Sequence, residues 1–145
     1  MEDTTEDFQP ILSILIKRGT YNDFMTLALI ASGAVANDME VRIFAMNDAV
    51  WALKKENVGK DTIVVSHDSD YANQLSDALN EGKIIPWWEL LNDLKDFGDI
   101  TITVCALVAD VLGLEQGDFH PLVDEVAGVA SFAADVEEST NVITL

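Results

Sequence analysis

The stretch Ile100-Thr-Ile-Thr-Val-Cys-Ala-Leu-Val-Ala-Asp-Val-Leu-Gly113 decides the fold of this chain. Its first five residues are apolar or β-branched, as in a buried strand. Residues 106–112 are compatible with a helix, and Gly113 suits the position just after a helix end. Cys105, the only cysteine among 145 residues, lies where the strand gives way to the helix. A strand that runs directly into a helix is typical of a parallel α/β sheet.

Strand and helix patterns alternate along the rest of the chain. Besides residues 100–104, apolar runs predict strands over residues 11–16, 40–45, 62–65 and 141–145. Helical patterns are found over residues 21–36, 48–55, about 71–79, 87–97, 106–112 and 130–138, whereas residues 120–126 fit neither type. The short connections predict a three-layer α/β/α sandwich around a mostly parallel sheet of about five strands, flavodoxin- or Rossmann-like.

Several of the expected helix ends are marked by residues that favour such positions. Thr20, with Asp23 three residues later, resembles a capping box, and the helix that it opens is apolar nearly all round. We therefore expect that helix to be deeply covered. Asn47 with its neighbouring aspartate caps the next helix, Pro86 suits the first position of a later one, and Gly98 ends it.

Length and composition indicate one domain in a reducing compartment. We expect a single domain over residues 10–145, preceded by a flexible acidic leader over residues 1–9. The leader has neither the basic nor the apolar region of a signal peptide, and no apolar run is long enough for a bilayer span. A single cysteine excludes an intrachain disulfide, so the sequence favours the cytoplasm.

The charge of the chain is strongly negative. It has 26 acidic and 8 basic residues, which gives a formal net charge of −18. Nucleic acids and anionic membranes are therefore excluded as partners, because phosphate binding needs clusters of Lys and Arg. The acidic residues are spread over the whole chain, which favours a salt-adapted surface over docking to a basic partner protein.

Most common catalytic and metal-binding patterns are absent. His67 and His120 are the only histidines, and with one cysteine they give no metal-ligand spacing. The sequence contains no phosphate-binding glycine fingerprint and no Ser-His-Asp order. We expect neither a metal nor a cofactor.

Cys105 is the strongest functional candidate. It is expected at the edge where the carboxyl ends of the strands meet, which is where open α/β folds bind ligands. The free N–H groups of the following helix favour a thiolate there. The alternative is a buried cysteine that only fills the core, since free cysteine is among the most buried residue types.

Four further residues are candidates at the same edge. Backbone amides at Gly19 and Thr20 could line an anion pocket, although a plain turn with a cap explains them equally well. Gly128 fits either a close backbone approach or a turn. His120, in a Phe-His-Pro loop, could serve as a base for Cys105 or simply be solvated.

Several segments together resemble the DsrE/DsrF-like sulfur-relay family, and most closely its stand-alone, peroxiredoxin-like branch. The most specific block is a strand followed by Cys105, an Asp-Val pair at Asp110 and Val111, and Gly113. Further matches, in family order, are Ile16-Lys-Arg-Gly-Thr20, Ile43-Phe-Ala-Met-Asn-Asp-Ala-Val-Trp-Ala-Leu-Lys-Lys55, Pro86-Trp-Trp-Glu-Leu90 and Gly128-Val-Ala-Ser-Phe132. Where stand-alone members often carry methionines and a glutamine after the cysteine, this chain has Ala106-Leu-Val108.

The resemblance implies a sulfur carrier or sulfurtransferase-like protein. Cys105 would hold sulfane sulfur as a persulfide or thiosulfonate and pass it to a partner thiol, on a small molecule or a second protein. Ala106 would join Gly19, Thr20 and Gly128 around the pocket. His120 and Asp110 would be accessory residues, although Asp110 lies five residues after the sulfur and does not obviously face it.

The resemblance also implies a homo-oligomer, a trimer first and a hexamer next. Two other classes of function stay open at this point. One is a thiol-dependent oxidoreductase of the peroxidase type, in which Cys105 forms a sulfenic acid that an external thiol resolves. The other is a non-catalytic oligomeric binding module whose cysteine is inert.

Overall fold

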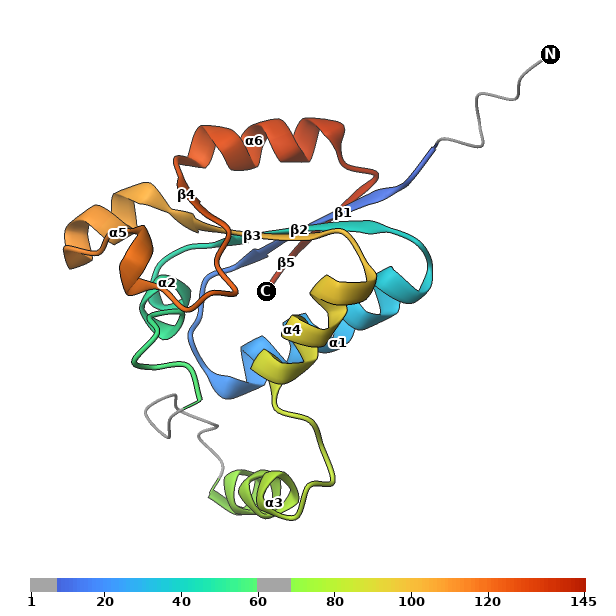
Figure 1. Ribbon diagram of the computed structural model, residues 1–145, viewed down its shortest axis with the longest axis vertical. Coiled ribbons are helices and arrows are strands. Elements are labelled where there is room, and N and C mark those ends of the chain that lie inside the picture. Colours follow the sequence, from blue (N-terminus) through green and yellow to red (C-terminus); the bar gives the residue numbers. More distant parts are fainter. Residues whose placement is uncertain (1–7, 60–68) are drawn as a thin grey trace.

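A five-stranded, all-parallel sheet lies at the centre of the computed structural model, which describes residues 8–59 and 69–145 (Figure 1). The strand order is β4-β3-β2-β1-β5, and Ile14, Ile43 and Ile102 share one register line across the three central strands. The strands are β1 (Ile11–Ile16), β2 (Glu40–Ala45), β3 (Ile100–Cys105), β4 (Glu125–Ala127) and β5 (Asn141–Thr144).

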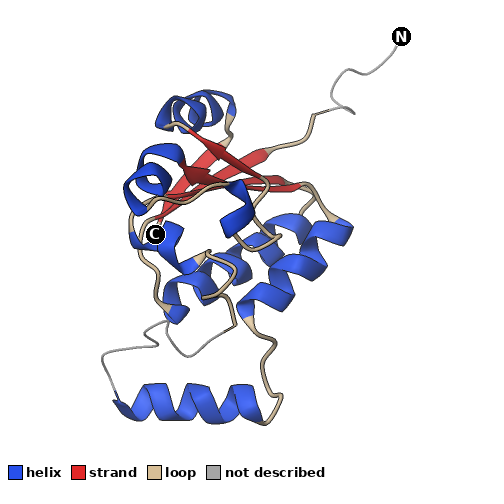
Figure 2. Cartoon of the chain, turned by 60° about the vertical axis from the view of Figure 1, so that its left-hand side comes forward, coloured by secondary structure: helices blue, strands red, loops and turns tan. Residues whose placement is uncertain are grey.

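Helices lie on both faces of this sheet, as predicted. α1 and α4 pack side by side under one face, α6 lies over the other, and α2 and α5 lie at the carboxyl edge (Figures 1 and 2). The bounds are α1 (Tyr21–Ala36), α2 (Asp48–Ala52), α3 (Ser69–Asn80), α4 (Trp87–Phe97), α5 (Ala106–Leu112) and α6 (Val129–Glu138), with a short 3₁₀ turn at Gln116–Asp118. Within the described part of the chain, no helix combines the length and apolar character that a membrane crossing requires.

The sheet face that α1 and α4 cover holds the hydrophobic core. Three isoleucines of the central strands that point to this face, Ile14, Ile43 and Ile102, are at most 2% exposed. Trp87 of α4 stacks on Phe24 of α1, with ring centroids 4.4 Å apart. Apolar residues at every second strand position thus fix which face is buried, since side chains alternate along a strand.

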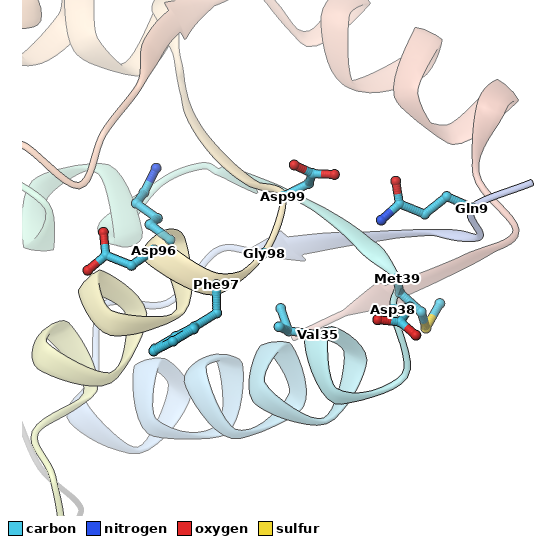
Figure 3. A pocket seen from close by; sticks show the side chains of 9 residues that line it. Gln9, Val35, Asp38, Met39, Asp96, Phe97, Gly98 and Asp99 are labelled. Carbon is cyan, nitrogen blue, oxygen red and sulfur yellow. The ribbon is translucent and has the colours of Figure 1, made fainter. Parts of the chain in front are cut away.

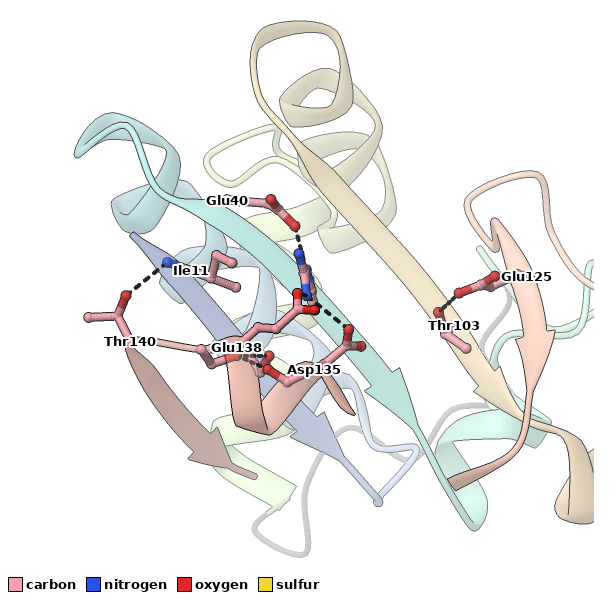
Figure 4. Close-up of polar contacts among 10 residues, drawn as sticks. Ile11, Glu40, Thr103, Glu125, Asp135, Glu138 and Thr140 are labelled. Atoms are coloured by element: carbon pink, nitrogen blue, oxygen red, sulfur yellow. Dashed lines mark hydrogen bonds and ion pairs between the residues drawn. The ribbon is translucent and has the colours of Figure 1, made fainter. Parts of the chain in front are cut away.

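The opposite face is more polar and is held by hydrogen bonds to α6. Arg42 on β2 pairs with Glu40 and reaches Asp135 and Glu138 of α6 at 3.0 and 2.8 Å (Figure 4). The fully buried hydroxyl of Ser13 is hydrogen-bonded to a serine just after the same helix. These contacts fix the position of α6, because buried polar groups need partners.

The structure corrects predictions about three helices. The helix predicted over residues 48–55 ends at Ala52, and the side chain of Asn47 does not cap it, since Asn47 has a φ of 51°. Pro86 is the cap residue that precedes α4 rather than its first helical residue. α1 is covered on one side only, because Leu29 on its outer side is 55% exposed.

Two further differences concern strands. Residues 120–126, which fit neither pattern, contribute most of the short strand β4 at the sheet edge. The strand predicted over residues 62–65, together with His67 and residues 1–7 of the acidic leader, lies outside the described residues.

Candidate functional site

The carboxyl edge of the sheet brings together the segments that follow each strand. Lys17 and Arg18 follow β1, Asn47 follows β2, Cys105 ends β3 and Gly128 follows β4. Because all strands are parallel, these segments meet at one edge. The sequence therefore predicted correctly that these segments share one edge of the sheet, and a functional role of that edge stays a prediction.

Cys105 is the last residue of β3 and the cap residue of α5. Its sheet neighbour on β4 is Ala127, and by alternation it shares the sheet face of Thr103, the face on which α6 lies. The residue is 3% exposed and belongs to the core cluster. A reagent in solution therefore reaches the sulfur only when a neighbouring element moves.

α5, which begins at the next residue, is held by few buried side chains. Its only buried residue is Ala109, whereas Leu107 and Val111 are 71% and 78% exposed. Asp110 is exposed as well, so the structure places it on the outer side of the helix and not against the sulfur. Few buried contacts mean a low free energy of local opening.

Gly19 and Thr20 have structural roles at this edge. A Cβ atom added at Gly19 would lie 2.6 Å from the backbone oxygen of Asp48, so the glycine lets α2 approach the end of β1. The Thr20 hydroxyl accepts a hydrogen bond from the N–H of Asp23 at 3.1 Å and donates one to its carboxylate. The hydroxyl is therefore fully used in capping α1.

Gly128 and Ala106 are less constrained. Gly128 is exposed and precedes α6, and a Cβ added there would meet no atom within 4 Å. The structure therefore gives no close backbone approach that would require this glycine. Ala106 is the half-buried first residue of α5, next to Cys105.

His120 is hydrogen-bonded away from Cys105. Its Nδ1 accepts a bond from the N–H of Leu122 at 3.1 Å, and its own backbone N–H donates to the carbonyl of Leu53 at 2.9 Å. Burial lowers the pKa of the ring below its usual value. These contacts give His120 a local role in holding the loop between α5 and β4.

We predict that His120 makes stability depend on pH. Its pKa is lower in the folded than in the unfolded chain, so the unfolded chain binds more protons as the pH falls through about 6.5. The wild type should then lose more unfolding free energy between about pH 7 and about pH 5 than His120→Asn, which keeps an acceptor and does not titrate. Urea denaturation at both pH values measures this, and parallel profiles of the two proteins would contradict it.

An open pocket lies at the same edge, and the sequence reasoning missed it. Its volume is about 670 Å³. Its lining comes from four segments of the chain. These are Lys17 and Arg18 after β1, Asn47 after β2, Asp48 and Trp51 of α2, and Val108 and Leu112 of α5. Cys105 is not among the lining residues, but Val108 lies three positions further along α5. In the sequence, the consecutive cations Lys17 and Arg18 are the feature that could have indicated this pocket.

A second pocket, of about 360 Å³, lies at the opposite edge of the sheet (Figure 3). Its lining includes three aspartates, Asp38, Asp96 and Asp99. Phe97 also lines it and is 83% exposed. None of its lining residues is a cysteine, serine or histidine. Among the residues that the structure describes, no group of three or more His, Cys, Asp and Glu side chains is arranged to hold a metal ion.

The fold and the edge cysteine define a class of protein, namely small parallel α/β domains with one thiol at the carboxyl edge of the sheet. The chain belongs to the DsrE/DsrF-like family, whose model matches residues 12–145. This confirms the resemblance found in the sequence.

Two known proteins are similar to this chain. The uncharacterized protein YrkE of Bacillus subtilis (strain 168) is 26% identical over 152 residues, covering 88% of this chain and 92% of that protein. The structure of a protein of unknown function, MTH1491 from Methanobacterium thermoautotrophicum, matches with a TM-score of 0.59 at 14% identity and covers 93% of this chain and 99% of that chain. The second likeness confirms the α/β fold.

Proposed function

We propose that this protein is a sulfur carrier that holds sulfane sulfur on Cys105 and passes it to a partner thiol. The observation that carries the proposal is the position of the single cysteine at the junction of β3 and α5, in a member of a family associated with sulfur relay. The first turn of α5 begins at the next residue, so the cysteine lies at the start of a helix on the carboxyl edge of the sheet.

The chemistry needs no cofactor and no net oxidation of the protein. The Cys105 thiolate attacks a sulfane sulfur of a polysulfide or a thionate, a new S–S bond forms, and the shortened donor leaves with the electron pair of the broken S–S bond. In the second step an acceptor thiolate attacks the outer sulfur, and Cys105 leaves as the thiolate. A single cysteine is sufficient because the acceptor lies on another molecule.

Access to the sulfur requires motion, since Cys105 is 3% exposed. We propose that α5 opens, because only one of its residues, Ala109, is buried. Loading should then be limited by the population of the open form. Ala109→Gly lowers helix stability by about 1 kcal/mol, which is about a fivefold increase in that population.

Intact-protein mass spectrometry tests the proposal. After incubation with polysulfide, the folded wild type should gain whole sulfur atoms, Cys105→Ser should gain none, and Ala109→Gly should load about fivefold faster. A parallel sample treated with hydrogen peroxide separates the oxidoreductase alternative, which would give oxygen adducts instead. An unchanged mass of the folded wild type in polysulfide would overturn the carrier proposal.

A second candidate is a binding module with an inert cysteine. The burial of Cys105 favours it, together with the neighbouring pocket, which the sulfur does not line. In this case neither reagent changes the mass of the folded protein. The same experiment therefore distinguishes the two candidates.

Self-association stays a prediction, with a trimer as the first expectation. The outer side of α5 exposes Leu107, Val111 and Leu112, and the helix has one charged residue, Asp110. In a chain of net charge −18, copies repel each other except where charges are few. This surface would therefore be the natural contact between copies, and a cytoplasmic location remains the expectation from the single cysteine.

A further inference from the structure

We propose that the 670 Å³ pocket at the carboxyl edge binds a small organic anion with a single negative charge. The charged group of the ligand would lie at Lys17 and Arg18, and its apolar body against Trp51 of α2 and Leu112 of α5. This inference goes beyond the proposed function and does not depend on the chemistry of Cys105.

The first argument is that Lys17 and Arg18 have little or no pairing with other side chains. Lys17 makes no hydrogen bond or ion pair within residues 8–59 and 69–145, and Arg18 has only a distant contact of 3.7 Å with Asp23 while its side chain is 66% exposed. The other basic residues in this part of the chain all have partners, namely Arg42, Lys54, Lys55, Lys83 and Lys95. Where acids outnumber bases 26 to 8, two adjacent cations with so little pairing indicate a site for an anion.

The second argument is the apolar wall beside these cations. Trp51 is 40% exposed and Leu112 is 41% exposed, and both line the pocket together with the half-buried Val108. A pocket of this volume is in the usual range for small-molecule sites, which combine apolar walls with a few polar groups. An inorganic anion would leave this wall in contact with water, so an organic ligand fits better.

The charge of the lining residues sets the charge of the ligand. Lys17 and Arg18 contribute two positive charges and Asp48 one negative charge, which leaves one positive charge in the pocket. A nucleotide or other polyphosphate would meet Asp48 without further cations to balance it, because the lining residues include no cation besides Lys17 and Arg18. The arrangement therefore favours a monocarboxylate or a monosulfonate over a polyanion.

Two fluorescent probes with similar aromatic bodies test this proposal. Anilinonaphthalene sulfonate carries one negative charge, whereas phenylnaphthylamine is neutral. The wild type should bind the sulfonate saturably at one site per chain, and Lys17→Gln/Arg18→Gln should weaken that binding about tenfold, which corresponds to about 1.4 kcal/mol. Binding of the neutral probe should change less than twofold.

Two control variants locate the site and separate it from the sulfur chemistry. Lys83→Gln alters the apolar pocket of about 250 Å³ beside α4, which is another place where the probe could bind, and should leave the affinity unchanged. Cys105→Ser should also bind normally, whatever the outcome of sulfur loading. Unfolding curves of every variant show whether it is fully folded, because partly unfolded protein also binds such probes. Equal affinity of the double variant and the wild type, loss on Lys83→Gln, or no saturable binding would overturn the proposal.

Discussion

Gly19→Ala is expected to lower the free energy of unfolding by about 2–3 kcal/mol. The added methyl group would lie 2.6 Å from the backbone oxygen of Asp48 and 3.1 Å from the Cβ of Ala52. Neither atom belongs to a flexible side-chain end, so α2 as a whole must move away from the end of β1. Urea denaturation measures the loss, and the displaced α2 carries Trp51 and Asp48 of the edge pocket with it.

Gly128→Ala is the matched control for this substitution. It makes the same chemical change at the start of another helix, where φ is −74° and an added Cβ meets nothing within 4 Å. Its effect should stay within about 1 kcal/mol in either direction, because alanine restricts the unfolded chain but is less favourable than glycine at the cap position of α6. If both substitutions have the same small effect, the close approach of α2 to Gly19 is wrong.

Arg42→Met is expected to cost about 2 kcal/mol of unfolding free energy. The side chain is 22% exposed and is bonded to Glu40, Asp135 and Glu138, which together raise its pKa above the ordinary arginine value. Methionine keeps the apolar stem but leaves three carboxylates close together without a cation (Figure 4). Added salt should recover part of the loss, because it screens their repulsion.

Arg18→Met removes the same group at a place where it has one distant partner, Asp23 at 3.7 Å. Its side chain is 66% exposed, so the loss should stay within about 0.5 kcal/mol. Chemical denaturation of both variants at low and high salt compares them directly. Equal losses for the two substitutions would mean that the Arg42 cluster does not hold α6 on the sheet.

The strands and helices of the central fold could be predicted because their patterns are strong. The apolar residues of β1 and β2 and the strand-to-helix change at Cys105 leave few alternatives, and the family motifs follow in the expected order. The short β4 could not be predicted, since a three-residue edge strand that begins with Glu125 has no period of its own. The early end of α2 at Ala52 is followed by a bridge between Lys54 and Phe119, which is far away in the sequence.

The place of Cys105 in the fold was predictable, but its burial was not. The sequence places Cys105 at the carboxyl edge, but its 3% exposure depends on how α5 and β4 pack around it. The edge pocket was missed for the same reason. Its cations follow β1 and its apolar wall comes from α2 and α5, and these segments meet only in the folded chain.

The central claim is that Cys105 of the folded protein carries sulfur and gives it up to another thiol. The most direct measurement loads the native protein with polysulfide, removes excess reagent, adds an acceptor thiol and follows the intact mass with peptide mapping. We predict one sulfur atom on the peptide that contains Cys105 and its complete loss to the acceptor. Sulfur that reaches Cys105 only after denaturation, or that the acceptor fails to remove, would contradict the account.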